Sequence, residues 1–240
     1  MRKEKKRYSW KQIIGVILFV TLILSIVYSA VSLFTAPSEG EAVVEFQRVK
    51  SDYTLMLIQC IGGVIVMFVP SFLERRWRID IPNYAYITYF IFLYCAIYLG
   101  EIRRFYFVVP HWDTYLHTFS GGMLGAMGFS LVSILNDNEK VPMTLSPFFI
   151  AMFSMCFALA AGAIWEIYEY TLDGLMGLNM QHYHLVDGTP LMGRAALYDT
   201  MKDLIVDALG ALVVSVIGYI ALKRQHRRLE MGKANQTEPA

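Results

Sequence analysis

The sequence predicts an all-α fold, a polytopic transmembrane helix bundle with about six spans. Hydrophobic residues make up 56% of the 240 residues, and the mean hydropathy is +0.44. Such values are typical of integral membrane proteins and exceed those of an ordinary soluble domain. The apolar residues gather in long runs, and Lys and Arg gather between those runs. Both features favour helices that cross a bilayer.

The first three predicted spans lie in the N-terminal half of the chain. They cover about residues 13–34, 53–72 and 84–100, each long enough to cross a bilayer. The first run follows a basic stretch, so it is either a cleaved signal peptide or a retained anchor. Its length exceeds that of a typical signal-peptide core, which favours the retained anchor.

The last three predicted spans lie in the C-terminal half. They cover about residues 114–135, 148–170 and 199–222. The longest loop, about residues 171–198, separates the fifth span from the sixth and contains His182-Tyr-His184. An even number of spans places both termini on the same side of the membrane.

The distribution of Lys and Arg sets the expected orientation. Most of the 21 basic residues lie at the termini, or in loops on the same side as the termini. This bias predicts that both termini are cytoplasmic. The expected parts are a basic cytoplasmic tail at 1–11, a six-span membrane domain at 12–222, and a basic, polar cytoplasmic tail at 223–240. The expected location is a bacterial-type cytoplasmic (inner) membrane, with the lipid bilayer as partner.

Several functional classes are disfavoured. The basic residues sit at membrane flanks and no nucleic-acid-binding motif occurs, so no nucleic-acid partner is expected. Cys60, Cys95 and Cys156 lie inside apolar runs without CxxC spacing, which argues against a disulfide framework or a thiolate metal site. HExxH, Walker A and GxSxG signatures are absent. The oligomeric state is left open.

Ionisable residues recur at helical spacing where the last three spans reach the expected outer face. They are, span by span, Asp113 and His117, then Glu166 and Glu169, then Asp199, Asp203 and Asp207. Side chains four residues apart share one face of a helix. Glycines such as Gly121 and Gly210 accompany them, and small residues allow membrane helices to approach closely. We therefore expect these groups to converge near the outer leaflet.

Carboxylates together with an imidazole can hold a hard or borderline divalent cation, and such a cation can activate water. The interpretation assigns metal ligation to His117, Glu166 and Asp203. Glu169 and Asp113 are the candidate catalytic groups. Further candidates for the site are Asp199, Asp207, Glu101, His182 and His184. The cofactor is left open, with a divalent metal ion as the candidate.

Three functions remain open at this point. The first is a metal-assisted enzyme acting on a lipid-linked or envelope substrate. The second is ion- or proton-coupled transport or ligand binding, because crowded carboxylates raise one another's pKa and retain a proton. The third is a structural or accessory membrane protein whose polar cluster only specifies helix packing. In that case an aspartate such as Asp199 is a helix cap. Whether the protein is an enzyme stays undecided.

The three polar blocks occur in a fixed order along the chain. They are His111-Trp-Asp113-x3-His117-x3-Gly121, Trp165-Glu166-x2-Glu169, and Asp199-Thr200-x2-Asp203 followed by Gly210-Ala211. This combination, over about residues 80–220, resembles the DUF2238 family of bacterial inner-membrane proteins, also called YjdF-like. The resemblance implies a polytopic fold, and it implies no particular activity. It makes motif positions of Asp113, His117, Glu166, Glu169, Asp199 and Asp203.

The resemblance has limits along the chain. The first span and the His182–His184 loop fall outside the shared pattern, and Asp207 is less fixed in such proteins. A looser similarity is to VanZ-like membrane proteins, which also place acids and a histidine at helix ends.

Overall fold

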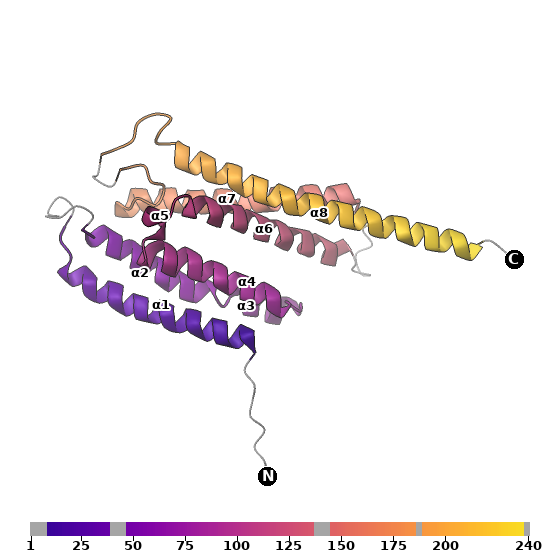
Figure 1. Cartoon of the computed structure of the whole chain (residues 1–240), viewed down its shortest axis with the longest axis horizontal. Coiled ribbons are helices and arrows are strands. Elements are labelled where there is room, and N and C mark those ends of the chain that lie inside the picture. Colours follow the sequence, from indigo (N-terminus) through magenta and orange to yellow (C-terminus); the bar gives the residue numbers. More distant parts are fainter. Residues whose placement is uncertain (1–8, 39–46, 137–144, 186–188, 238–240) are drawn as a thin grey trace, which may run out of the picture. The chain divides into compact units, whose positions relative to one another are not determined.

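The computed structural model describes residues 9–38, 47–136, 145–185 and 189–237 (Figure 1). Within these ranges the chain is helical and contains no strand, although His184 and Pro190 form an isolated antiparallel bridge. The helices are α1 (Trp10–Thr35), α2 (Lys50–Val66), α3 (Val69–Trp77), α4 (Asn83–Leu93), the π-helix η1 (Tyr94–Ile102), α5 (Phe105–Val108), α6 (Trp112–Asn136), α7 (Pro147–Met176) and α8 (Tyr198–Thr237). The predicted all-α class is confirmed.

Five helical segments of the described chain are long and apolar enough to cross a membrane. They are residues 10–35, 50–77, 83–102, 147–176 and 198–229. Helix α6 coincides with the predicted fourth span and has 25 residues, yet it is not among the five. Its glycines and hydroxyl residues, together with Asp113 and His117, lower its hydropathy. The predicted count of about six spans therefore includes one helix that is supported by its length alone.

The chain divides into two compact units. The first unit contains α1 to α5 and the first turn of α6. The second contains the rest of α6, α7 up to Asp173, residues 179–185 and α8. The boundary falls inside α6, which is one uninterrupted helix (Figure 1).

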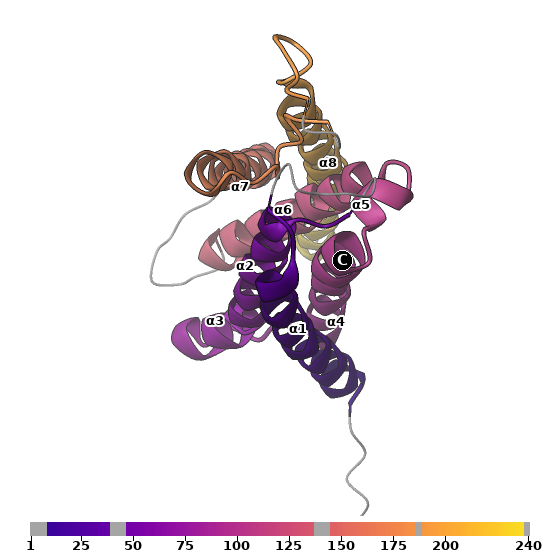
Figure 2. The ribbon, with the colours of Figure 1, turned by 90° about the vertical axis from the view of Figure 1, so that its left-hand side faces the viewer.

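Helix α1 packs into the core of the first unit. Leu18 and Leu22 are 1% and 0% exposed, and they belong to a cluster that includes Cys60 of α2 and Phe90 of α4. A Cβ atom added at Gly63 of α2 would lie 3.2 Å from Leu22, so the two helices lie close together there. Helices α1, α2 and α4 stand side by side when viewed from the end (Figure 2). The retained anchor stays a prediction.

The start of α1 is also fixed. Ser9 and Gln12 form a capping box, in which Ser9 Oγ accepts from Gln12 N at 3.3 Å and Gln12 Oε1 accepts from Ser9 N at 3.0 Å. Lys11 Nζ lies 3.2 Å from the centroid of the Tyr86 ring, a cation–π contact. The Tyr86 hydroxyl donates to Glu74 Oε2 at 2.6 Å. These contacts join α1 to α3 and α4.

In the second unit, buried residues form a stripe along α8 and another along α7. On α8 the stripe is Asp203, Asp207, Ala211 and Ser215, each no more than 3% exposed. On α7 it is Ile150, Ser154, Ala158, Gly162 and Glu166. Both stripes recur every four residues, the spacing that keeps side chains on one helix face. The acidic groups therefore share their helix faces with small residues.

Two glycines let α6 and α8 cross at close range. A Cβ atom at Gly121 would collide with the backbone of Asp207, and one at Gly210 would collide with the carbonyl oxygen of Thr118. Helix α7 joins α6 through Ser154, whose hydroxyl donates to the carbonyl oxygen of Gly125. Small residues at helix contacts are the usual means by which membrane helices pack without a hydrophobic driving force.

Candidate metal centre

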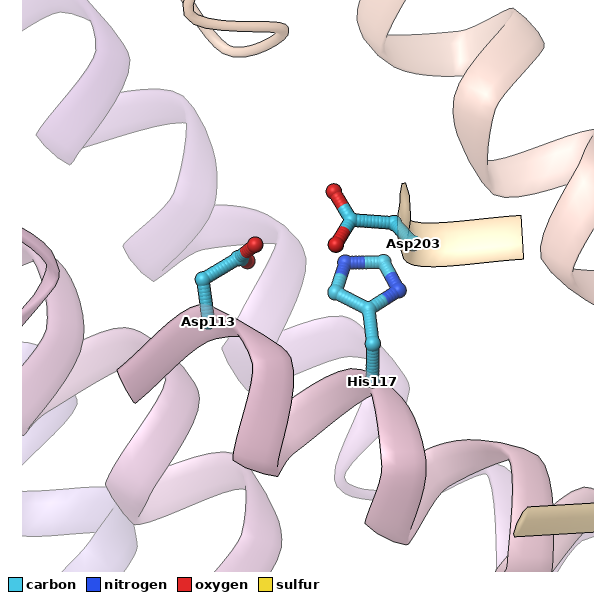
Figure 3. Close-up of side chains that lie close together, drawn as sticks. All are labelled: Asp113, His117 and Asp203. Atoms are coloured by element: carbon cyan, nitrogen blue, oxygen red, sulfur yellow. The ribbon is translucent and has the colours of Figure 1, made fainter. Parts of the chain in front are cut away.

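The first two turns of α6 carry an aspartate and a histidine on one face. Asp113 and His117 are four residues apart on this continuous helix, and Asp203 of α8 faces the histidine (Figure 3). One candidate ligand atom from each residue lies within 4.8 Å of the others. Ligand atoms on one metal ion at bond lengths of ~2.1 Å are at most ~4.2 Å apart. Small side-chain movements would therefore bring these three groups onto one ion.

The two ring nitrogens of His117 have different surroundings. Nδ1 lies 3.4 Å from Oδ2 of Asp207, one turn deeper along α8 than Asp203. Nε2, the nitrogen farther from the backbone, is turned towards Asp113 and Asp203 (Figure 3). A carboxylate that accepts a hydrogen bond from Nδ1–H fixes the tautomer in which Nε2 carries a lone pair for a metal ion. This arrangement is the usual one for a metal-binding histidine.

Asp207 is held in place on both sides. Ser120 Oγ donates to Asp207 Oδ1 at 3.1 Å, and it also lies 2.9 Å from the carbonyl oxygen of His117. Gly162 of α7 provides space for the carboxylate, because a Cβ atom there would lie 2.5 Å from Asp207 Oδ2. Asp207 itself is 2% exposed. Asp207, which is less fixed in the family resemblance, thus has two hydrogen-bond partners, and Gly162 leaves space for its carboxylate.

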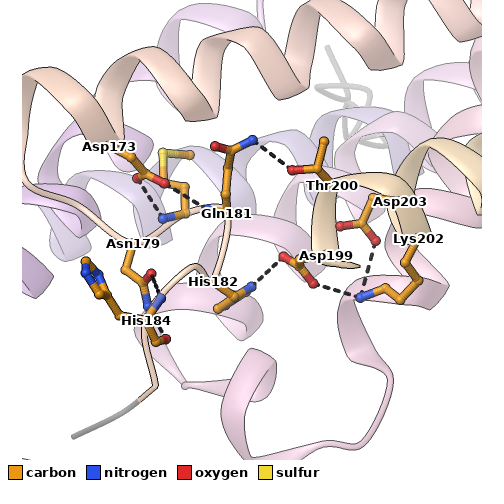
Figure 4. A network of polar contacts seen from close by, with 10 residues as sticks. Asp173, Asn179, Gln181, His182, His184, Asp199, Thr200, Lys202 and Asp203 are labelled. Carbon is orange, nitrogen blue, oxygen red and sulfur yellow. Dashed lines mark hydrogen bonds and ion pairs between the residues drawn. The ribbon is translucent and has the colours of Figure 1, made fainter. Parts of the chain in front are cut away.

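At the start of α8, Asp199 and Asp203 both form ion pairs with Lys202. Lys202 Nζ lies 2.9 Å from Asp199 Oδ1 and 3.4 Å from Asp203 Oδ1. His182 from the loop completes this network, with Nδ1 2.8 Å from Asp199 Oδ2 (Figure 4). Asp199 lies in the first turn of α8, and its carboxylate binds these two side chains. Its charge therefore has a role beyond that of a helix cap.

The loop itself is fastened to α7 by an aspartate that sequence reasoning missed. Asp173 is 5% exposed, and its carboxylate accepts from Met180 N at 2.8 Å and from Gln181 N at 3.0 Å (Figure 4). The Gln181 side chain donates to Thr200 Oγ1 at 2.8 Å. The missed signal was spacing, since Asp173 follows Glu166 by seven residues, two turns along the same face.

Glu166 is one of two buried acidic groups of α7, at 5% exposure. Neither of its carboxylate oxygens has a hydrogen-bond partner among the residues that the structure describes. His117, Thr200 and Gln181 are near enough to influence its charge. A buried carboxylate without hydrogen bonds is costly, and the side chains of Thr200 and Gln181 are the donor groups in its neighbourhood.

A comparison with protein families places the chain. Residues 14–224 match a family described as predicted membrane protein (DUF2238). The chain belongs to the DUF2238 family. The match is longer than the expected 80–220 and includes α1 and the loop with His182 and His184. No curated protein and no solved structure matches the chain, and the looser similarity to VanZ-like proteins stays a prediction.

Glu169 and His184 also lie outside the ligand group in this DUF2238 protein. Glu169 is half-buried one turn along α7 from Glu166 and is not in the group of atoms within 4.8 Å. The ring of His184 lies against Tyr183, with 3.9 Å between ring centroids, and points away from Asp199 (Figure 4). Of the two loop histidines, His182 contacts Asp199 and His184 does not.

Glu101 belongs to the first unit, at the end of η1. Its side chain accepts from Gln59 Nε2 at 3.4 Å. Its carbonyl oxygen and that of Ile102 accept from Arg48 Nη2 at 3.1 and 2.9 Å. An arginine at a helix C-terminus satisfies carbonyl groups that the helix leaves without partners. These contacts give Glu101 a structural role.

Charge determines the chemistry of the cluster. Its carboxylates belong to Asp113, Glu166, Asp199, Asp203 and Asp207, and its cationic or imidazole groups to Lys202, His117 and His182. Carboxylates inside membrane helices are costly unless they are paired with a cation or coordinate a metal. Two carboxylates with one imidazole suit Zn²⁺, Mn²⁺ or Fe²⁺ better than a soft metal. Asp113, His117 and Asp203 thus form a group that could hold a borderline divalent cation.

Proposed function

We propose that this protein is a metal-dependent membrane enzyme acting on a lipid-linked or envelope substrate. Asp113, His117 and Asp203 bind a divalent cation, and Asp207 orients His117. The observation that carries the proposal is the orientation of the imidazole. One ring nitrogen lies 3.4 Å from a buried carboxylate, and the other is turned towards two further carboxylates (Figure 3). A histidine that serves helix packing alone does not need acids at both nitrogens.

Glu166 supplies the proton chemistry in this proposal. A divalent ion lowers the pKa of a bound water, so that the water loses its proton near neutral pH. A divalent ion held by Asp113, His117 and Asp203 would activate a water for attack on the electrophilic atom of the substrate. Glu166 would accept the proton of that water. As the bond to the leaving group breaks, Glu166 returns the proton to that group. The reaction class is hydrolysis, with one water consumed and no redox change.

The proposed location is the bacterial cytoplasmic membrane, with both termini in the cytoplasm and the site near the outer leaflet. The bias of Lys and Arg supports this orientation. At the C-terminus, the basic segment from Lys223 to Arg228 continues α8 beyond its apolar part. The candidate site lies near the opposite end of α8, in its first three turns. A substrate would then reach it from the outer membrane surface.

Metal content is the direct test. The protein is purified in detergent, loaded with Zn²⁺ or Mn²⁺, desalted and analysed for bound metal. We expect stoichiometric metal in the wild type and in His184→Ala, which changes a histidine outside the ligand group. We expect loss of metal in His117→Ala and Asp203→Asn. If the wild type keeps no metal while a control metalloprotein in the same buffers keeps its own, the proposal is wrong.

Proton- or cation-coupled transport is the second candidate, and one observation favours it. Asp199, Asp203 and Asp207 form a ladder along α8, linked through His182 to the loop and through His117 to α6. Such a ladder could pass protons between carboxylates. Reconstitution into liposomes with a pH-sensitive dye separates the two functions. Proton flux that disappears in Asp203→Asn, from protein that binds no metal, would favour transport.

A further inference from the structure

Side chains with N–H or O–H groups lie at the start of α8 and on the loop beside it, next to Asp199 and Asp203 of the candidate site. They come from α8 and from the loop at residues 179–185, and they are Gln181, His182, Thr200 and Lys202 (Figure 4). Lys202 bridges Asp199 and Asp203. The side chains of Lys202 and His182 are 24% and 35% exposed, compared with 3% for Asp203. The donors are therefore more accessible than the carboxylates that they adjoin.

The structure orders these groups by depth along α8. Asp199 lies in the first turn, Asp203 in the second, and Asp207 a further turn along. A ligand that approaches from the start of α8 meets Lys202 and His182 before it reaches Asp203 and His117. The start of a membrane-crossing helix lies at the depth of the lipid headgroups. Phosphate groups of lipids and of lipid-linked molecules are found at this depth.

We propose that the metal centre takes a phosphoryl group, with Lys202 and the loop donors binding its oxygens beside the metal ion. The inference rests on the proposed function, since it needs the metal. Without a cation, Asp113, Asp203 and Glu166 would repel an anion. When a divalent ion is bound to Asp203, the positive charge of the ion repels the ammonium group of Lys202 away from that carboxylate. The ammonium group then stays paired with Asp199, at the edge of the site, where it meets the anion.

The donor chemistry selects this ligand class over others. A phosphoryl group has several oxygens that accept hydrogen bonds, and lysine binds phosphate as a point charge. Gln181 and Thr200 add neutral donors, and a metal ion neutralises charge that develops on phosphoryl oxygens. An ammonium ligand would instead be repelled by Lys202 and the metal ion. A neutral ester would gain little from a cation placed beside the metal.

The test measures anion binding by metal-loaded protein. The full-length protein in detergent is loaded with Mn²⁺ and titrated with inorganic phosphate, and broadening of the phosphate ³¹P signal by bound Mn²⁺ reports binding at the metal. Lys202→Gln is compared with Lys223→Gln, a lysine farther along the same helix. We expect Lys202→Gln to weaken phosphate binding at least about tenfold and to bind Mn²⁺ as tightly as the wild type or more tightly. Lys223→Gln should match the wild type.

A second arm identifies the source of the phosphoryl group. A short-chain phosphatidic acid and glycerol phosphate are compared as competitors of inorganic phosphate. Tighter binding of the lipid indicates a headgroup ligand, and equal binding indicates a soluble phosphate ester; both outcomes support the inference. Mn²⁺ binding without phosphate binding overturns the inference and leaves the proposed function standing. Failure to bind Mn²⁺ at all overturns the proposed function as well.

Discussion

Oδ2 of Asp207 lies 3.4 Å from Nδ1 of His117 and joins α8 to α6 inside the second unit. The two residues belong to chain segments 90 positions apart, and the contact sits where Gly121 brings the helices together. Close helix approach and histidine orientation are therefore parts of one arrangement. Replacement of Asp207 should therefore alter the affinity with which His117 binds a metal ion.

The first prediction concerns Asp207→Asn. The amide keeps the size of the carboxylate but removes the charge and can turn an N–H towards Nδ1, which favours the wrong tautomer of His117. We expect metal affinity to fall roughly 10- to 100-fold, as for other partners of metal-binding histidines. Titration with Co²⁺, followed by its visible absorption bands, measures both the affinity and the ligand geometry.

The control for Asp207→Asn is Asp80→Asn, which changes an exposed aspartate of the first unit. Thermal unfolding of each variant in detergent shows whether the protein remains folded. A folded Asp207→Asn protein that binds Co²⁺ with wild-type affinity and an unchanged spectrum would contradict the assigned role of Asp207.

The second prediction concerns the crossing of α6 and α8. In Gly121→Ala the new methyl group meets the backbone of Asp207, which cannot turn aside as a side chain can. We expect a loss of about 1–3 kcal/mol of stability, the usual cost of overpacking, together with weaker metal binding. Gly62→Ala is the matched control, because no atom outside its own helix lies within 4 Å of a Cβ at that position. Thermal unfolding should therefore show a loss of stability for Gly121→Ala relative to the wild type. The change for Gly62→Ala should be smaller or opposite in sign.

Sequence reasoning predicted most of the helices because each is a long apolar run. It also brought His117 and Asp203 together, since four-residue spacing and small residues mark a helix contact. It could not assign partners, because a pattern shows which face a residue occupies and not which atom it meets. Asp207 illustrates this limit: it is the candidate less fixed in the family resemblance, while its contact with His117 depends on the crossing at Gly121.

Loop contacts were beyond the reach of periodicity. Asp173 binds backbone N–H groups of Met180 and Gln181, and backbone donors leave no trace in residue type. His182 has a positive φ of 48°. This conformation is uncommon for a non-glycine residue and cannot be predicted from the sequence. The loop histidines looked equivalent in sequence, yet His182 contacts Asp199 and His184 packs on Tyr183.

The third prediction concerns α1 as a permanent part of the fold. Leu22 is fully buried, while Leu24 on the same helix is 64% exposed. Leu22→Ala should cost about 2–5 kcal/mol through the cavity that it leaves, and Leu24→Ala should stay within about 0.5 kcal/mol of the wild type. Unfolding in detergent measures the difference.

An epitope tag at the N-terminus should remain on the full-length chain in the membrane fraction, and its removal there would support a cleaved signal peptide.

The fourth prediction concerns the attachment of the loop to α7. Asp173→Ala removes the acceptor of two backbone N–H groups, and hydrogen bonds to a charged acceptor contribute about 1.5–3 kcal/mol each. We expect the amides of Met180 and Gln181 to exchange with deuterium roughly ten- to a hundredfold faster. Amides of the α6–α8 crossing should be unaffected. Because Gln181 and His182 lie on this loop, the same variant should weaken phosphate binding. The proposed metal ligands Asp113, His117 and Asp203 should bind metal as in the wild type. Wild-type exchange at both amides would show that Asp173 does not hold the loop in solution.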